Sequence, residues 1–425
     1  MKSHYKILGD YIREVNVRNT ELKDLDLLGI SIQKEFIPSI ANTIGTDMSK
    51  YKIVKKNQFA YGTVTSRNGD KISIALLQNY DEALISQAYI SFEVIDENVL
   101  LPEYLMMWFR RTEFDRYARY MSYGSAREVF SWEEMCNVKL PVPTIEKQRE
   151  IVKEFNTILS RINLKNNMIN KLEETINTIY KKWFVNFDFP NEYGKPYKFS
   201  GGNTFFDSKL NKDIPVGWEV KELGDFITES KGGDWGKSEI IGNYNSKVFC
   251  VRGADIPKLK RGSIDDMPVR YILKKNLENK QLASNQIVIE ISGGSPIQST
   301  GRAILITKKL LKILKYPIIC SNFCQTITVN NELYANLIFS HINYLYKLNI
   351  FFNYENSTIG LKNLDLAGIL SSELVVKPSQ DILEKYNLLY EKINDAIICY
   401  GREIDILEAH KQLILSNLMI NKTIY

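Results

Sequence analysis

The sequence predicts an α+β protein in which two pseudo-repeated α/β domains are joined by two long antiparallel coiled-coil helices. The length of 425 residues exceeds the size at which a single hydrophobic core stops growing, so at least two domains are expected. Two long stretches carry apolar residues in heptad spacing, and short segments of the first half return in the second. We therefore place one domain at residues 1–143, a central helix at 144–186, a linker and second domain at 187–378, and a C-terminal helix at 379–425.

Each long helix is predicted from a narrow apolar seam. The first helix follows Pro143, with Thr144 able to cap it and Glu146 suited to its first turn. A stripe of apolar residues spaced alternately three and four positions apart needs a partner helix. The two stripes can cover each other, and the domain between them in sequence favours antiparallel pairing. The first seam is Ile151, Phe155, Ile158, Ile162, Ile169, Leu172, Ile176, Ile179 and Trp183, and the second is Ile382, Tyr386, Leu389, Ile393, Ile397, Tyr400, Ile404, Leu407, Ile414 and Leu418.

The internal repeat is the most informative feature of the two domains. "YKILGDYI" at 5–12 returns as "VKELGDFI" at 220–227, and "NQFAYG" at 57–62 parallels "NQIVIE" at 285–290. "ISQAYISFEV" at 85–94 parallels "CSNFCQTITV" at 320–329. Each half then continues through a Ser-containing loop, a short strand and a proline into its long helix. The chain is therefore expected to hold two copies of one plan, a β-rich domain followed by a long helix.

Composition and motifs argue against an enzyme. The net charge of +5 permits a nucleic-acid partner without demanding one. Three His and five scattered Cys give no zinc-site spacing, so we expect no metal and reduced thiols in a cytoplasmic protein. "GGDWGKS" at 232–238 is one residue short of a phosphate-binding P-loop and follows no apolar strand. No signal peptide, membrane-spanning run or catalytic constellation is found, so the chain is predicted to be non-catalytic, with no membrane contact.

Donor-rich loops on β-type segments are the remaining candidates for function. Arg and Lys can read guanine edges, Asn and Gln can read adenine, and hydroxyls and glycine N–H groups can fix phosphates. Taken singly, each such residue also fits a solvated surface or a turn; clusters at matching places in both halves favour DNA binding. The candidates are Ser66, Arg67, Asn68, Lys71, Ser73, Arg110, Arg116, Ser125 and Arg127 in the first domain, and Lys231, Gly232, Gly233, Arg252, Arg261, Ser292, Gly293, Gly294, Gln298, Arg302, Ser321 and Asn322 in the second.

These stretches together resemble the specificity (S) subunit of a type I restriction–modification enzyme over essentially the full chain. "SRNGDKISIAL", "YGSAREVFSWEEMCNVKLPVPTIEKQREIV" and "INKLEETINTIYKKWFVNFDF" resemble its first recognition domain, the exit from that domain and the central helix. "PVGWEVKELGDF", "ISGGSPIQSTGR" and "ICSNF" resemble its second recognition domain. "NSTIGLKNLDL" is only a loose match to "GSAREVFSWEEM" in the first half.

The resemblance implies a mechanism. Each of two target-recognition domains would read one half of a bipartite double-stranded DNA target, and the helices would set the unread spacer between the halves. Two methyltransferase (M) subunits, which bind S-adenosylmethionine, would dock on the helices, and motor–nuclease (R) subunits would bring ATP-dependent cleavage. The chain itself would bind no cofactor. The expected subunit-interface residues are Phe155, Ile162, Leu172, Ile179, Tyr400 and Leu407.

Two other functions fit the same residues. The chain could be a specificity subunit of another restriction or defence system with the same recognition chemistry. It could also be a coiled-coil scaffold whose two domains bind protein. The scaffold predicts no salt-dependent affinity for DNA, whereas phosphate contacts require such a dependence. The target sequence and the spacer length cannot be read from the residues.

Overall fold

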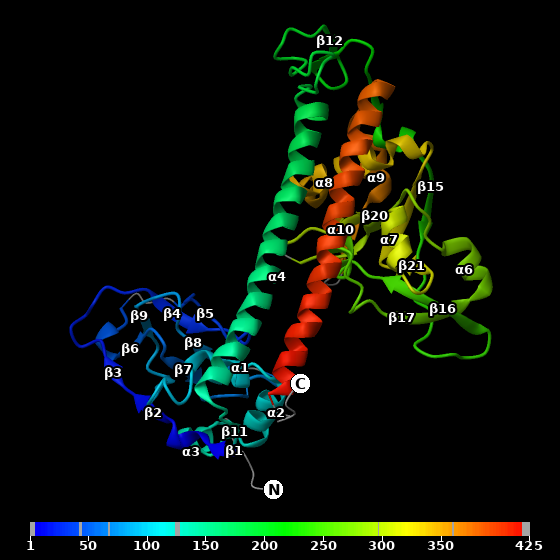
Figure 1. The fold of residues 1–425 in the computed structure, drawn as a ribbon. Helices are drawn as coiled ribbons and strands as arrows, with labels where there is room; N and C mark the ends of the chain where they lie inside the picture. Colours follow the sequence, from blue (N-terminus) through cyan, green and yellow to red (C-terminus); the bar gives the residue numbers. More distant parts are fainter. Residues whose placement is uncertain are drawn as a thin grey trace. The chain divides into compact units, whose positions relative to one another are not determined.

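The computed structural model describes residues 5–41, 45–66, 69–123, 128–295, 297–358 and 361–418 (Figure 1). The chain divides into two compact units. The first unit comprises Met1–Ile162 together with Leu407–Tyr425, and the second comprises Asn163–Ile406. Each unit holds one β-rich domain and part of both long helices.

The first unit contains a four-stranded sheet in the order β2-β10-β7-β8, a five-stranded sheet in the order β3-β6-β9-β4-β5, and the pair β1-β11. Its core packs α1 onto the four-stranded sheet, where Phe59 and Phe92 stack with ring centroids 4.8 Å apart. The elements are β1 (Tyr5–Ile7), β2 (Ile12–Val15), β3 (Val17–Arg18), β4 (Leu27–Ile30), β5 (Phe36–Pro38), β6 (Lys52–Lys55), β7 (Phe59–Gly62), β8 (Ile74–Leu76), β9 (Glu82–Ile85), β10 (Tyr89–Val94), α1 (Pro102–Phe109), α2 (Thr112–Tyr120), α3 (Trp132–Cys136) and β11 (Lys139–Pro141).

The second unit repeats the four-stranded sheet in the order β15-β22-β18-β20 and adds two three-stranded sheets, β17-β16-β21 and β19-β24-β23. The pairs β12-β13 and β14-β25 complete it. Its elements are β12 (Thr204–Asp207), β13 (Lys212–Pro215), β14 (Glu219–Glu222), β15 (Ile227–Gly232), β16 (Tyr244–Val251), α5 (Ile256–Lys260), β17 (Val269–Leu273), α6 (Lys274–Lys280), β18 (Gln286–Glu290), β19 (Ser292–Gly293), β20 (Ala303–Leu305), α7 (Lys308–Ile313), β21 (Ile318–Cys320), β22 (Cys324–Val329), α8 (Ala335–Lys347), β23 (Glu355–Thr358), β24 (Leu361–Leu364), α9 (Leu366–Ser372) and β25 (Leu374–Lys377).

The repeated Asn-Gln pair has the same local structure in both units. Asn57 and Asn285 both adopt the left-handed backbone region, with φ of 65° and 68°, which Asn tolerates better than most residues. The Gln58 side chain accepts a hydrogen bond from the N–H of Lys55, 2.8 Å away. Gln286 does the same with the N–H of Ala283, also at 2.8 Å. The turn before the central strand of each sheet is therefore built by the same two residue types.

The repeated Leu-Gly-Asp segment also has equivalent roles. Leu8 donates its N–H to the carbonyl of Val138, and Leu223 donates to the carbonyl of Glu373, both at 2.8 Å. Each segment forms a short 3-10 helix against the short helix that precedes the last strand of its domain. A Cβ at Gly224 would lie 2.9 Å from the Leu370 carbonyl oxygen, so the close approach requires glycine. This contact joins the beginning and the end of each domain.

The two long helices, α4 (Ile145–Tyr180) and α10 (Gln380–Asn417), run side by side in opposite directions (Figure 1). Phe155 lies in one cluster with Leu415, whereas Lys165 pairs with Glu403 further along. Beyond the end of α4, Phe184 packs edge-on against Tyr386 at 4.9 Å. Successive residues of the first helix thus meet earlier residues of the second, which is the antiparallel arrangement that the seams predict.

The apolar surface of α10 is wider than its predicted seam. Leu383, Tyr390 and Ile398 are buried although none of them belongs to that seam. Leu383 and Tyr390 belong to the main core of the second unit, and Ile398 belongs to a second cluster beside β20. These residues are buried because the β-rich domain covers a second face of the helix, whereas the predicted seam residue Leu389 is 38% exposed.

Two general features limit the possible functions. Among the described residues, no helix is long and apolar enough to cross a membrane. Within the same residues, no group of three or more His, Cys, Asp or Glu side chains is placed to hold a metal ion.

Candidate nucleic-acid interface

In the second unit the structure brings four sequence-distant segments together at one end of the β15-β22-β18-β20 sheet. Gly233 donates its N–H to the Cys324 carbonyl at 3.3 Å, and Ile291 donates to the Phe323 carbonyl at 2.9 Å. The Ser292 hydroxyl bonds the Asn363 side chain at 2.7 Å, which adds the β23-β24 hairpin. The predicted residues Gly232, Gly233, Ser292, Gly293, Ser321 and Asn322 all lie in these segments.

Several of these residues shape the loops from inside. Gly233 packs so closely on the next loop that a Cβ there would lie 2.1 Å from the Ser321 carbonyl oxygen. Gly293 has φ of 143°, and its Cβ would lie 2.8 Å from a carboxylate oxygen of Glu290. Ser321 is buried, whereas Asn322 is exposed at the turn. The two glycines and Ser321 thus position the backbone, and Asn322 presents a side chain to solvent.

The predicted arginines of the second unit all have acidic partners. Arg252 forms two hydrogen bonds with Asp255, at 2.8 and 2.9 Å. Arg302 bonds the buried Glu290 at 2.5 and 2.8 Å, and this hydrogen-bonded carboxylate raises the pKa of the guanidinium.

Arg261 bonds both oxygens of Glu173 on α4, at 2.9 and 3.0 Å. Its role in the structure is therefore to hold α5 against the long helix. This contact joins residues 88 positions apart, so no local sequence signal could have revealed it.

The remaining predicted residues of the second unit lie near the surface. Lys231 is exposed and pairs with Glu229 at 2.9 Å. Gln298 closes a turn by donating its N–H to the Ser295 hydroxyl at 3.1 Å, and its side chain reaches the Tyr346 hydroxyl at 3.3 Å. Gly294 has φ of 75°, which favours glycine.

The first unit has an equivalent end. The N–H of Thr65 bonds the Glu128 carbonyl at 3.0 Å, and the N–H of Phe130 bonds the Thr63 carbonyl at 2.9 Å. The described flanks of two polar loops, around residues 66–70 and 123–128, are thereby joined. In the second unit, Leu364 donates to the Ile291 carbonyl at 2.9 Å in the corresponding place. The loosely matching segments "GSAREVFSWEEM" and "NSTIGLKNLDL" therefore lie at equivalent positions.

The predicted residues of the first unit are distributed unevenly. Ser66 and Lys71 are exposed at the joined loops, whereas Ser73 is buried, with its hydroxyl against Gly62. Arg116 is 74% exposed and lies 3.6 Å from Glu113 on the same helix. Arg110 is half-buried over the Phe155 ring at 5.8 Å, and burial lowers the pKa of its guanidinium. Arg67, Asn68, Ser125 and Arg127 lie outside the described residues.

The structure adds features that sequence reasoning missed. Tyr123 and Phe323 are 63% and 55% exposed beside the polar loops of the first and second units. Behind the first set of loops, the buried Lys34 and Asp115 form an ion pair at 2.8 Å. Asp115 also accepts the N–H of Ile72 at 3.2 Å, which fixes the chain directly after Lys71. No spacing in the sequence links Lys34, Ile72 and Asp115.

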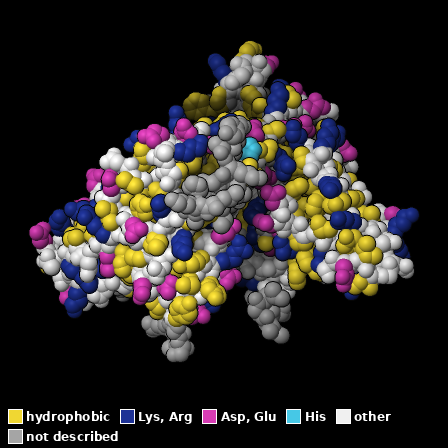
Figure 2. Space-filling model, turned by 60° about the horizontal axis from the view of Figure 1, so that its bottom comes forward, with side chains coloured by type: hydrophobic (Ala, Val, Ile, Leu, Met, Phe, Trp, Pro, Cys, Tyr) yellow, Lys and Arg dark blue, Asp and Glu magenta, His cyan; other side chains and the backbone are white. Residues whose placement is uncertain are grey.

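Surface charge alone does not mark the site. Figure 2 shows Lys and Arg side chains interspersed with Asp and Glu over the described part of the face it presents. Because neighbouring opposite charges cancel at a distance, recognition at such a surface depends on where individual donors lie. The loop ends carry donors in both units, and those ends are the best candidates for an interface.

Comparison with known proteins supports the predicted resemblance. Residues 19–174 match the family described as "Type I restriction modification DNA specificity domain". Over this part of the chain the resemblance to type I restriction–modification specificity subunits, which are non-catalytic, is confirmed.

Individual relatives agree with this resemblance. The specificity subunit of the type I restriction enzyme MjaIX from Methanocaldococcus jannaschii is 24% identical over 330 residues, which cover 77% of this chain and 71% of the relative. The HindI specificity subunit from Haemophilus influenzae is 23% identical over 139 residues, or 32% of this chain and 30% of the relative. The crystal structure of the type I S subunit from M. genitalium superposes with a TM-score of 0.56 at 12% identity, over 97% of this chain and 95% of that one. The last comparison confirms the predicted fold class.

The six expected subunit-interface residues lie mainly between parts of this chain. Phe155, Ile162 and Leu407 are buried in the first unit. Ile179 packs against the core of the second unit, and the Tyr400 ring lies 4.9 Å beneath the Lys165 amine. Leu172 is half-buried. These side chains therefore hold the chain's own helices together.

Proposed function

We propose that this specificity subunit reads a bipartite double-stranded DNA target, with each β-rich domain reading one half and the helix pair setting the spacer. The observation that carries the proposal is the repeat of one four-stranded sheet, in the order β2-β10-β7-β8 and again β15-β22-β18-β20. A protein with two equivalent readers on a fixed frame requires two half-sites at a set separation.

The exposed donors at the loop ends are the proposed base and phosphate contacts. In the first unit these are Ser66 and Lys71, and in the second unit Asn322. The half-buried Ser292 is proposed as a further contact, and so are Arg67 and Asn68, which lie outside the described residues. Arg252 keeps 43% of its side chain exposed and is a further candidate for a phosphate contact. Arg261 and Arg302 are proposed to support the surface from behind, because their guanidinium groups bond Glu173 and Glu290.

The partners follow from the same proposal. Two methyltransferase subunits would supply S-adenosylmethionine and flip an adenine out of the duplex for methylation. R subunits would add ATP-dependent cleavage. Most seam residues are buried or half-buried within the chain, so the methyltransferase subunits are proposed to dock on the outer faces of α4 and α10. Leu164, 61% exposed, and Leu413, 57% exposed, are candidate contacts there.

The experiment is a methylome. The chain is produced together with the methyltransferase encoded beside it, in a host without adenine methylation, and modified adenines are located by sequencing. We expect a split motif with two specified halves around a fixed gap. Exchange of residues 1–143 for the corresponding segment of a relative should change only one half.

Matched single variants then test the two surfaces. Lys71→Ala should relax discrimination in one half of the motif, and Asn322→Ala should relax it in the other. Loss of a good bidentate base contact costs about 1–3 kcal/mol, or roughly tenfold to a hundredfold in discrimination. A continuous motif, or both variants acting on the same half, would contradict the two-reader arrangement. No salt-dependent DNA affinity would favour a protein-binding scaffold instead.

A further inference from the structure

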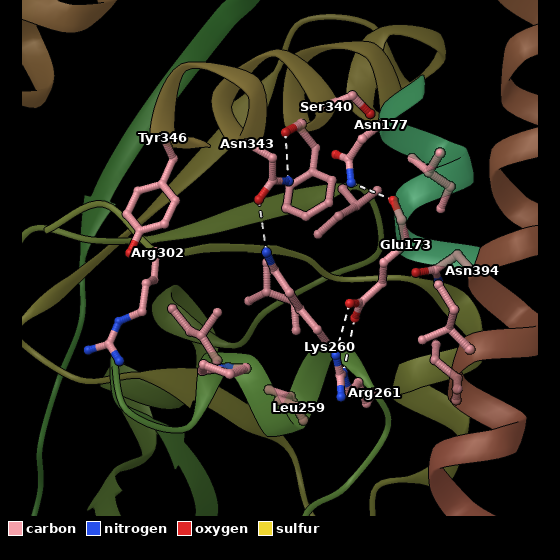
Figure 3. A pocket seen from close by; sticks show the side chains of 18 of the residues that line it. Glu173, Asn177, Leu259, Lys260, Arg261, Arg302, Ser340, Asn343, Tyr346 and Asn394 are labelled. Atoms are coloured by element: carbon pink, nitrogen blue, oxygen red, sulfur yellow. Dashed lines mark hydrogen bonds and ion pairs between the residues drawn. The ribbon is translucent and has the colours of Figure 1, made fainter. Parts of the chain in front are cut away.

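The second unit contains a cavity whose lining includes none of the proposed base or phosphate contacts. It has a volume of about 570 Å³, within the range of small-molecule sites, and opens between α4, α5, β20, α8 and α10 (Figure 3). Its walls are mostly apolar, with Leu259, Ile304, Phe339 and Ile397 among the lining residues.

One amine in this cavity has no acidic partner. Lys260, the last residue of α5, is half-buried and donates to the amide oxygen of Asn343 at 2.8 Å. The amine also lies 5.2 Å from the centre of the Phe339 ring. Among the described residues, no carboxylate lies within ion-pair distance of this amine. Burial lowers the pKa of Lys260 to about 8, while the more distant Glu173 opposes the shift and Lys347 adds to it.

The other charges around the cavity do not neutralise Lys260. Glu173 is the nearby carboxylate on α4, but both of its oxygens bond Arg261. Arg302 is neutralised by Glu290 in the same way. Lys347 of α8 lies at the cavity and is exposed. A positive charge held against apolar walls, with only a neutral amide as partner, is costly unless an anion joins it.

We propose that this cavity binds a small organic anion, with a carboxylate or sulfonate at the Lys260 amine and an apolar body along Phe339 and Ile304. Asn343 is placed to hold the amine in position. The proposal does not depend on DNA recognition, because every lining residue belongs to the second unit and none is a proposed base or phosphate contact. Arg261 and Arg302 line the cavity as well, but their guanidinium groups bond Glu173 and Glu290 and not the proposed ligand. A bound ligand would touch the β-rich domain and both long helices at once, and would therefore stabilise the second unit.

The test uses two fluorescent probes that share an apolar body and differ in charge. The full-length chain is titrated at neutral pH with anilinonaphthalene sulfonate and with the uncharged phenylnaphthylamine. We expect saturable binding of the sulfonate probe at one site per chain. Lys260→Met should weaken its affinity about tenfold or more, and should leave the affinity of the uncharged probe within about twofold. Lys275→Met, at an exposed lysine of α6, is the matched control and should change neither affinity.

A measurement on the unaltered chain guards against misfolding of the Lys260 variant. Octanoate should displace the sulfonate probe at a concentration at least about tenfold lower than octanol does, and should raise the melting temperature. Asn394→Trp, which fills the cavity from α10, should abolish binding of both probes. The proposal is overturned if Lys260→Met leaves the affinity of the sulfonate probe unchanged, or if octanoate and octanol compete equally.

Discussion

The two β-rich domains share one sheet but are hydrogen-bonded to the long helices by different groups. In the first unit the buried Gln148 side chain of α4 accepts the N–H of Leu101 and donates to the Val99 carbonyl, both at 2.8 Å, while Phe155 and Leu415 lie in the domain's own apolar core. In the second unit, α8 makes hydrogen bonds to both helices: His341 to Tyr180 and Ser340 to Tyr386, each at 2.6 Å. The difference indicates that the repeat specifies the reading domain, whereas each attachment is specified separately by a few side chains.

The Glu290–Arg302 ion pair is one difference between the two shared sheets. In the matched segments, Glu290 occupies the position of Gly62 in the first unit. Glu290 is 3% exposed, and Arg302 bonds both of its oxygens. Glu290→Gln leaves the half-buried Arg302 guanidinium without its counter-charge, so we expect a loss of about 4 kcal/mol in the free energy of unfolding of the second unit.

Urea denaturation of the full-length chain measures this effect, and the matched control is Glu229→Gln in the exposed pair with Lys231. The control should change stability by less than about 1 kcal/mol. The double variant Glu290→Gln with Arg302→Met should recover most of the loss, because it removes the stranded charge. A cost no larger than that of the control would mean that solvent reaches the pair, and that the two sheets are more alike than their charges suggest.

The attachment through His341 predicts a pH dependence confined to the second unit. Burial lowers the pKa of His341 to about 4 from its ordinary value of 6.5, and the pKa of Tyr180 is raised well above its ordinary value, so the phenol stays protonated. Between about pH 4 and pH 6.5, the His341 imidazole binds a proton in the unfolded chain but not in the folded chain. Stability is therefore unaffected above pH 6.5 and falls as the pH drops from 6.5 to about 4, by about 3 kcal/mol in total.

Comparison with His341→Gln isolates this contribution, because glutamine can keep a hydrogen bond to Tyr180 without titrating. Unfolding free energies measured between neutral pH and pH 4 should fall about 3 kcal/mol further in the unaltered chain than in this variant. His410→Gln, at an exposed position of α10, should behave like the unaltered chain. Equal acid sensitivity in His341→Gln would show that the imidazole is hydrated, and would weaken the contrast between the two attachments.

The features that could be predicted from the sequence are those that repeat or have a period. The heptad seams predict α4 and α10, and "YKILGDYI" with "VKELGDFI" predicts two equivalent domains. The features that could not be predicted depend on contacts between distant residues. Arg261 looks like a DNA-binding residue until its partner Glu173 is known, and the buried Lys34–Asp115 pair joins positions that no pattern relates. Side-chain direction decides whether an arginine faces solvent or a carboxylate, and that direction is fixed by tertiary packing.

The smallest predicted effect concerns the Asn turn that both four-stranded sheets share. Asn57 and Asn285 hold the same left-handed backbone conformation, which costs alanine about 1 kcal/mol more than it costs glycine. Asn57→Ala and Asn285→Ala should therefore each lower the unfolding free energy by about 1 kcal/mol, while the two Asn→Gly variants lose only a few tenths. Thermal unfolding of the four variants measures the differences. Because the two turns share their φ angle and their Gln hydrogen bond, we expect equal losses of stability in both units, even though the attachments of the two domains differ. A loss in one unit alone would mean that the turn stabilises that sheet only. The likeness between the two sheets would then be limited to their strand order.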